Sequence, residues 1–177
     1  MLKVIRSMRE LEFGQLMNVY AETNIEHAQQ NWPDQPDGYR LALAEQDFYD
    51  YLRHCFFTVP GAVYCVWLVN GEYVSALRLE PWRDGALLEA LETALPQRKQ
   101  GYAQALVCSV QIYLREQGAV GLYSHISKRN TASIAVHEKC GFRKIHDYAA
   151  YLDGSVDRHS ATYIYPNLSD NPNEFSK

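Results

Sequence analysis

The stretch Leu95-Pro96-Gln97-Arg98-Lys99-Gln100-Gly101-Tyr102-Ala103 lies between a run of strand-forming residues and a run with helical spacing. The start of a helix offers backbone N–H groups without intrahelical partners, together with the positive end of the helix dipole. Gly101 has no Cβ, so an anion can come close to the backbone, and Arg98 and Lys99 add positive charge beside the same turn. This combination predicts a cradle for a diphosphate group. Taken alone the signal is weak, because most basic turns with one glycine bind nothing.

The residues after this turn alternate between helical and strand patterns. Leu106, Val110 and Leu114 mark one helical face, and Asn130 is a suitable N-cap for the next helix. The predicted elements are a helix at 102–117, a strand at 120–126, a helix at 130–139 and strands at 142–152 and 160–165. The strand-helix-strand step needs a crossover, so we expect that strand pair to be parallel within a largely antiparallel sheet.

The residues before the turn predict helices first and then a meander of strands. The predicted elements are a strand at 2–5, helices at 9–21 and 39–54 with a polar loop or broken helix between them, and strands at 63–69, 73–80 and 87–94. Asn70-Gly71 between two β-rich runs is a strong hairpin signal. We expect one α+β domain over residues 1–166, followed by a flexible tail at 167–177 that is rich in Asn, Ser and Asp.

The composition is that of an ordinary globular protein, with 47% hydrophobic and 21% charged residues. A formal net charge of -4 argues against a nucleic-acid binder that uses a broad basic surface. The longest apolar run, 62–69, is far too short to cross a membrane, and residues 1–14 lack the layout of a signal peptide. We therefore expect a cytoplasmic protein with neither a nucleic-acid nor a membrane partner.

The cysteines do not form a metal-binding pattern. No two of them make a C-x-x-C pair, and no His/Cys cluster has zinc spacing. We therefore predict no metal site. Each cysteine lies in or beside an apolar run, which predicts four buried free thiols and suits a reducing compartment. They are Cys55, Cys65, Cys108 and Cys140.

Two blocks of this sequence have patterns found together in one enzyme family. Residues 98–103 read R-K-Q-G-Y-A, and an Asn-led helix at 130–133 continues to E-K-C-G-F at 138–142. They resemble the two conserved blocks of the GCN5-related N-acetyltransferases, in the same order and structural context. The resemblance is strong over residues 73–142 and rests on element order elsewhere. It implies the acyl-CoA N-acyltransferase fold, in which helices flank a twisted, mostly antiparallel sheet that is splayed between its fourth and fifth strands.

The resemblance also implies acetyl-CoA as the acyl donor. Its pantetheine arm would lie in the splay, along backbone groups of Glu92, Thr93 and Ala94, and backbone N–H groups of residues 100–103 would hold the diphosphate. Asn130 and Ser133 would touch the pantetheine or its thiol end. The implied cofactor-binding residues are Thr93, Ala94, Leu95, Arg98, Lys99, Gln100, Gly101, Tyr102, Ala103, Asn130 and Ser133.

Acyl transfer to an amine needs a neutral amine, donors for the oxyanion and an acid for the departing thiolate. The family often places Tyr four residues before the Gly of G-F to protonate the thiolate, and this sequence has His137 there. Its intrinsic pKa suits proton transfer near neutrality. Glu89 and Glu92, which strict alternation places on opposite faces of one strand, are candidate bases. The alternatives are that His137 only packs on its helix and that each Glu is a solvated surface residue.

The first 60 residues are expected to shape the acceptor site. An acidic rim there would favour a cationic amine, although the same charges can be ordinary solvated ones. The residues are Glu22, Glu26, Asp34, Asp37, Glu45, Asp47 and Asp50. We predict an enzyme that transfers an acetyl group directly from acetyl-CoA to a primary amine of a small molecule or protein, and that can form a homodimer. The alternative is a non-catalytic acyl-CoA binding or sensing module, which the missing Tyr at position 137 favours.

Overall fold

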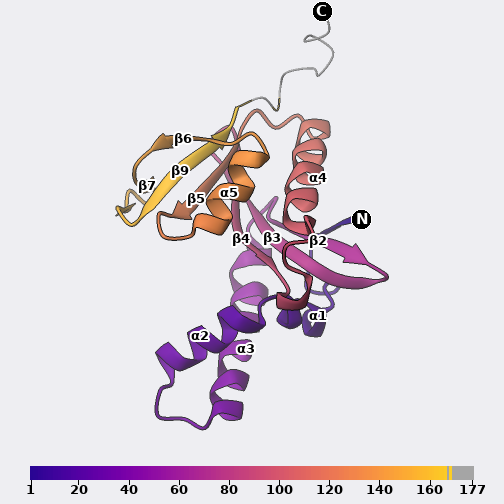
Figure 1. Ribbon diagram of the computed structural model, residues 1–177, viewed down its shortest axis with the longest axis vertical. Helices are drawn as coiled ribbons and strands as arrows, with labels where there is room; N and C mark the ends of the chain where they lie inside the picture. The colour runs from indigo at the N-terminus through magenta and orange to yellow at the C-terminus, as the bar shows by residue number, and fades with distance from the viewer. Residues whose placement is uncertain (167, 169–177) are drawn as a thin grey trace, which may run out of the picture.

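A seven-stranded sheet forms the centre of the computed structural model, which describes residues 1–166 and 168 (Figure 1). Its strands are β1 (Leu2–Ile5), β2 (Val63–Val69), β3 (Glu72–Trp82), β4 (Gly85–Thr93), β5 (Leu122–Ser127), β6 (Arg143–His146) and β9 (Ser160–Tyr165). Their order is β1-β2-β3-β4-β5-β9-β6, and every neighbouring pair is antiparallel except β4 and β5. The predicted mixed sheet, with one parallel pair around the turn, is confirmed.

Helices cover both faces of this sheet. One face carries α1 (Phe13–Val19), α2 (Ala21–Asn31) and α3 (Asp37–His54), and the other carries α4 (Tyr102–Glu116) and α5 (Thr131–Lys139). Alternation along the strands supplies both cores: Cys65 and Leu77 pack under α4, whereas Tyr64 and Ala76 pack under α1 and α3. The α2–α3 pair extends beyond the end of the sheet (Figure 1). Single 3-10 turns, η1 (Phe56–Thr58) and η2 (Leu95–Gln97), follow α3 and β4.

β4 and β5 separate after a short parallel contact. Residues 86–88 of β4 pair with residues 122–124 of β5, and the last five residues of β4 have no partner on that side. β5 thus leaves this edge of residues 89–93 open, while side chains of the protein already bond to the carbonyls of Ala90, Glu92 and Thr93. The predicted splay between the fourth and fifth strands is confirmed.

Two predicted segments differ from the structure, and a third agrees with one of its two alternatives. The segment predicted as a loop or broken helix is a broken helix, because α2 ends at Asn31, ahead of Pro33 and Pro36, and α3 begins at Asp37. The helix predicted from residue 9 begins at Phe13. The single strand predicted at 142–152 divides into β6 and β7 (Ala149–Ala150), because β7 leaves the main sheet and pairs with β8 (Val156–Asp157).

The environment of the cysteines matches the prediction only in part. Cys65 and Cys140 are buried and Cys108 is half-buried, but Cys55 is exposed because it lies at the C-cap of α3, outside the sheet. The predicted tail at 167–177 lies outside the described residues, apart from Leu168, which is buried in the α4-side core. Within the described part of the chain, no helix combines the length and apolarity needed to cross a membrane.

Candidate functional site

The turn before α4 has the conformation that the anion cradle requires. Gly101 is the N-cap of α4, a helix of 15 residues, and its φ of 83° lies in the left-handed region that favours glycine. No side chain of the described residues caps this helix, which leaves the N–H groups of its first turn open to a ligand. A Cβ at Gly101 would meet no atom within 4 Å. The left-handed backbone angle thus gives a reason for glycine at this position, and the space beside it that an anion would need is open.

A groove of about 700 Å³ runs from this turn to the start of α5. Two helix starts border it, because it is lined by residues 101–104 and by Asn130, Ala132 and Ser133. Asn130 is the N-cap of α5, as predicted: its Oδ1 accepts a hydrogen bond from the Ser133 N–H at 2.9 Å. The lining residues are Thr23, Leu91, Glu92, Thr93, Gln97, Arg98, Lys99, Gly101, Tyr102, Ala103, Gln104, Asn130, Ala132, Ser133, Val136 and Lys139.

Eight of the eleven residues implied for cofactor binding line this groove. Ala94, Leu95 and Gln100 do not. Ala94 is buried and its N–H donates to the carbonyl of Val74 at 3.0 Å, whereas 58% of Leu95 is exposed. The Gln100 amide bonds back to Pro96. The geometry thus brings together the strand end, the turn and the Asn-led helix, as the resemblance implies.

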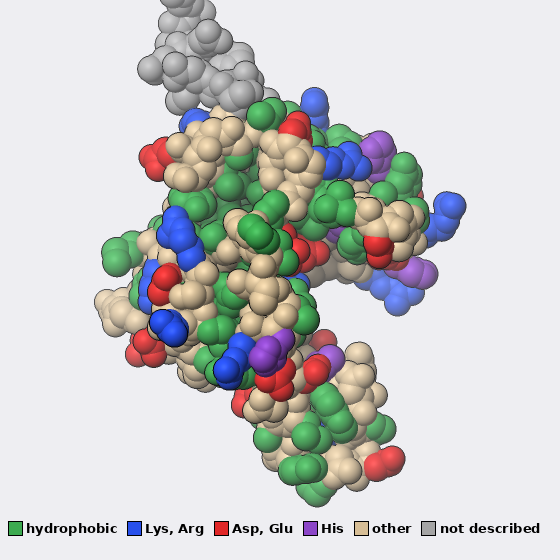
Figure 2. Space-filling model, turned by 180° about the vertical axis from the view of Figure 1, so that it is seen from behind, with side chains coloured by type: hydrophobic (Ala, Val, Ile, Leu, Met, Phe, Trp, Pro, Cys, Tyr) green, Lys and Arg blue, Asp and Glu red, His purple; other side chains and the backbone are tan. Residues whose placement is uncertain are grey.

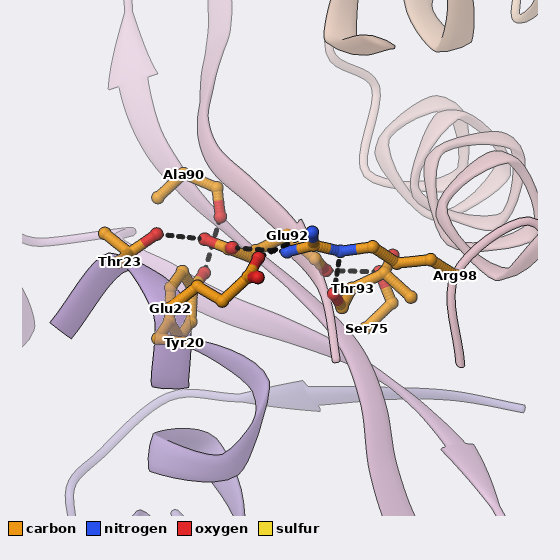
Figure 3. A network of polar contacts seen from close by, with 8 residues as sticks. All are labelled: Tyr20, Glu22, Thr23, Ser75, Ala90, Glu92, Thr93 and Arg98. Atoms are coloured by element: carbon orange, nitrogen blue, oxygen red, sulfur yellow. Dashed lines mark hydrogen bonds and ion pairs between the residues drawn. The ribbon is translucent and has the colours of Figure 1, made fainter. Parts of the chain in front are cut away.

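Arg98 points to carboxylates and away from the helix start (Figure 3). Its guanidinium lies 2.6 Å from Glu22 of α2 and 3.2 Å from Glu92 of β4, and its Nε donates to the carbonyl of Thr93. Thr23 of α2 donates its hydroxyl to the other Glu92 oxygen at 2.6 Å. Arg98 therefore connects the predicted cradle to α2, and its charge is already balanced by two acids.

Glu89 and Glu92 lie on the same face of β4, which corrects the expectation of opposite faces. Arg78 pairs with Glu89, and Ala76 pairs with Glu92. The two-residue step from Ala76 to Arg78 on β3 is therefore matched by a three-residue step from Glu89 to Glu92 on β4. The extra residue is Ala90, a β-bulge with φ of 52°. Strict alternation fails at a bulge. Both carboxylates consequently face α1–α3, where burial raises their pKa values; Arg78 opposes this shift at Glu89, and the hydrogen bond from Thr23 opposes it at Glu92.

His137 is buried and does not line the groove. Its Nδ1 lies 2.8 Å from the carbonyl oxygen and 3.3 Å from the hydroxyl of Ser133, one turn earlier. Its Nε2 is buried without a partner among the described residues, and the ring packs edge-on against Phe142. Burial lowers its pKa. In this structure the imidazole thus reaches the groove only through Ser133, which does line it.

A second cavity, of about 840 Å³, lies between α2, α3 and the strands β3 and β4. It adjoins the groove, because Thr23 lines both. Figure 2 shows acidic and histidine side chains gathered where the projecting helices meet the body. Of the predicted acidic rim, only Asp47 and Asp50 line the cavity. Its lining residues are Tyr20, Thr23, Asn24, His27, Ala44, Asp47, Phe48, Asp50, Tyr51, His54, Cys55, Arg78 and Ala90.

The sequence analysis missed three residues of this region. Tyr20 donates its hydroxyl to the carbonyl of Ala90 at the bulge, Thr23 binds Glu92, and Arg78 lines the cavity from β3. Tyr20 and Thr23 lie in one segment, far along the chain from Arg78 and from the β4 residues that they contact, and no short motif marks them. The pairing of β3 with β4 is a signal for Arg78 and the bulge alone.

Solved structures of acetyltransferases share this architecture. The PaiA N-acetyltransferase from Thermoplasma acidophilum, in complex with coenzyme A, superposes with a TM-score of 0.64 at 8% identity, covering 94% of this chain and 99% of that one. The ribosomal-protein-S18-alanine N-acetyltransferase from Escherichia coli gives 0.58 at 20% identity, with 98% of each chain covered. An acetyltransferase from Streptococcus agalactiae superposes with a TM-score of 0.63 at 17% identity, covering 92% of this chain and 96% of that one. At these identities the likeness shows the fold.

The sequence itself gives a family match but no close relative. No curated protein matches the chain in sequence. The family model described as the acetyltransferase (GNAT) family matches residues 16–142, which is more than half of the 177 residues and includes the turn, the bulge and most of both cavities. The chain belongs to the GNAT family of acetyltransferases.

Proposed function

We propose that this protein transfers an acetyl group from acetyl-CoA to a primary amine of a small molecule or protein, directly within a ternary complex. The observation that carries the proposal is the pair of adjoining cavities. The groove at two helix starts suits the coenzyme, and the cavity under α2 and α3 suits an acceptor. They meet at Thr23 and at the bulged segment of β4. A relative of the same fold was solved with coenzyme A.

The donor would be held mainly by backbone groups. The first turn of α4 would bind the diphosphate through its N–H groups, and the part of β4 that β5 leaves unpaired would bind the pantetheine arm like an added strand. Lys99 and Lys139, which line the groove, would add positive charge near the phosphates. Backbone N–H groups at the same part of β4 would stabilise the oxyanion.

Glu92 would accept the proton of the acceptor amine, directly or through water. It lines the groove, whereas Glu89 does not and lies 3.5 Å from Arg78. An amine of the lysine type is cationic near neutral pH, so it must lose a proton before its nitrogen can attack the thioester carbon. The attack forms the C–N bond and breaks the C–S bond. The raised pKa of Glu92 makes it a better base than an ordinary carboxylate.

The departing thiolate would be stabilised through Ser133 and His137. If Nδ1 of His137 carries its proton, it donates to the Ser133 carbonyl at 2.8 Å, and the nearby Ser133 hydroxyl is left free to donate into the groove. His137 would then act as a positioning residue and Ser133 as the group that contacts the thiolate. The predicted role of His137 as the acid itself remains to be tested with His137→Phe and Ser133→Ala.

The experiment that tests the function is a screen for coenzyme A release from acetyl-CoA with polyamines, aminoglycosides, amino acids and peptide N-termini. Release with at least one amine, and a mass gain of one acetyl group on that amine, is the expected result. Protection from heating by coenzyme A without release across the panel would instead support the non-catalytic acyl-CoA binding module. The specific observation in favour of that module is a buried His137 where the family often has Tyr. Neither protection nor release would contradict both.

A further inference from the structure

Arg78 is a buried cation on the wall of the acceptor cavity. It projects from β3, and only 18% of its side chain is exposed. Its guanidinium carbon lies 5.1 Å from the ring centre of Tyr51 and 5.8 Å from that of Phe56, so aromatic rings hold it in place. A positive charge this deep in a cavity requires negative partners or hydrogen-bond acceptors.

The guanidinium has few such partners among the described residues. It has five N–H donors in a planar fork. Its one hydrogen bond there runs from Nη2 to Glu89 at 3.5 Å, which is at the long limit, and its Nε is buried without a partner. Nη1 makes no hydrogen bond to any described residue. A ligand carboxylate could accept from this fork in the bidentate manner that Arg favours.

Glu89 does not satisfy the hydrogen-bond donors of Arg78. A single contact at 3.5 Å leaves most of the fork unused, and Glu89 is not part of the cavity wall. Burial also raises the pKa of Glu89, although Arg78 opposes that shift. Arg115 has a similarly buried and unpaired Nε, but it lines neither cavity. Arg78 is thus distinguished by its position on the cavity wall.

The rest of the cavity has an apolar middle and a rim on which two aspartates lie beside His27 and His54. Asp47 and Asp50 of α3 lie on the exposed rim, with 64% and 51% of their side chains exposed. Tyr20, Phe48 and Ala44 form much of the wall between. A molecule with an amine, a carboxylate and an apolar side chain matches this distribution: the rim attracts the ammonium and Arg78 takes the carboxylate.

We propose that the acceptor is an amine that also carries a carboxylate, of the amino-acid class, and that Arg78 binds this carboxylate. The inference rests on the proposed function and adds a substrate class to it. Polyamines and aminoglycosides have no carboxylate for Arg78 to bind, so they should be poor acceptors. The amine would reach the thioester past Ala90 and Thr23, where the cavity meets the groove.

The test compares an amino acid with its own amide and with the amine obtained by decarboxylation. Phenylalanine, phenylalaninamide and phenethylamine form one such set, and leucine gives a second. For the wild-type protein we expect kcat/KM for the acid to exceed that for either analogue by about tenfold or more, because a charge-assisted hydrogen bond is lost. Arg78→Gln should remove this preference and leave coenzyme A affinity unchanged. Arg115→Gln is the matched control and should keep the preference.

The outcomes separate the inference from the function on which it rests. Acetylation of all three compounds at similar rates by the wild-type protein would overturn the inference and leave the proposed function intact, even if Arg78→Gln failed to fold. Equal loss with all three compounds in a folded Arg78→Gln would also overturn it. If no amine is acetylated, the proposed function fails. The role of Arg78 is then decided by whether the amino acid, and not its amide, raises the melting temperature of the complex with coenzyme A.

Discussion

The groove that we propose for the donor and the cavity that we propose for the acceptor are built in different ways, and are called the donor groove and the acceptor cavity below. The groove depends on backbone groups at two helix starts and on an unpaired length of β4, all within residues 89–133. The acceptor cavity is lined by side chains from two helices and two strands that span residues 20–90. A site made of backbone recognises a constant ligand, whereas a site made of side chains can change its ligand one residue at a time. The two regions should therefore respond differently to mutation.

The largest expected effect comes from Gly101→Glu. The left-handed φ opposes any side chain, and a carboxylate would stand where the diphosphate is expected, so the shift in melting temperature caused by coenzyme A should disappear. Gly71→Glu is a matched control, because Gly71 has φ of 86° in the β2–β3 hairpin and also has open space around it. Both variants should lose about 1–2 kcal/mol of stability from strain. Protection of Gly101→Glu by coenzyme A would show that the cradle lies elsewhere.

Glu92→Gln should have the next largest effect, and on turnover alone. Loss of a general base lowers kcat by about 10²–10⁴-fold, while coenzyme A affinity should stay within a few-fold of wild type. Burial raises the pKa of Glu92, so this carboxylate takes up a proton at a higher pH than an ordinary one. When the pH is lowered, the loss of wild-type kcat should therefore begin at that higher pH. The Glu89→Gln variant is the comparison. Equal losses in the two variants would mean that the groove-lining carboxylate has no special role.

His137→Phe should change how stability depends on pH. Burial lowers the pKa of His137 in the folded protein, so below about pH 6.5 the unfolded chain binds a proton that the folded one does not. As the pH is lowered below about 6.5, the free energy of unfolding should therefore fall by up to about 1.4 kcal/mol per pH unit. The fall should end when the pH reaches the pKa of His137 in the folded protein. The variant lacks this contribution, and denaturant titrations from pH 8 to 5 would measure the difference. Parallel profiles would show that His137 is accessible to protons in the folded state.

Glu22→Gln should have the smallest effect and would show how the two regions communicate. Glu22 of α2 lies 2.6 Å from Arg98 at the edge of the groove, and both side chains are substantially exposed. Removing the carboxylate should free Arg98 for the diphosphate and raise coenzyme A affinity about two- to fivefold, more at low salt. Glu26→Gln, on the same helix but outside the ion pairs of Arg98, should change little. A weaker affinity would mean that Glu22 holds Arg98 in its binding position.

Local features of the sequence were sufficient to predict the turn, the helix cap and the hairpin that shape this part of the molecule. The turn at 98–103, the cap at Asn130 and the Asn70-Gly71 hairpin each depend on a few adjacent residues, and each is found as expected. The acceptor side was not predictable in the same way. The bulge at Ala90 depends on how β4 pairs with β3, and no residue pattern within β4 predicts it. For the same reason the contacts of Tyr20, Thr23 and Arg78 could not be read from the chain.

The bulge separates two properties of β4 that are usually linked, namely which way its side chains point and how its backbone curves. If Ala90 is left out of the count, Leu88, Glu89, Leu91 and Glu92 alternate regularly between the α4 core and the opposite face. A chain with Ala90 deleted would thus keep both carboxylates where they are, yet lose the carbonyl that Tyr20 holds. One residue without a side-chain function fixes the shape of the strand between donor and acceptor.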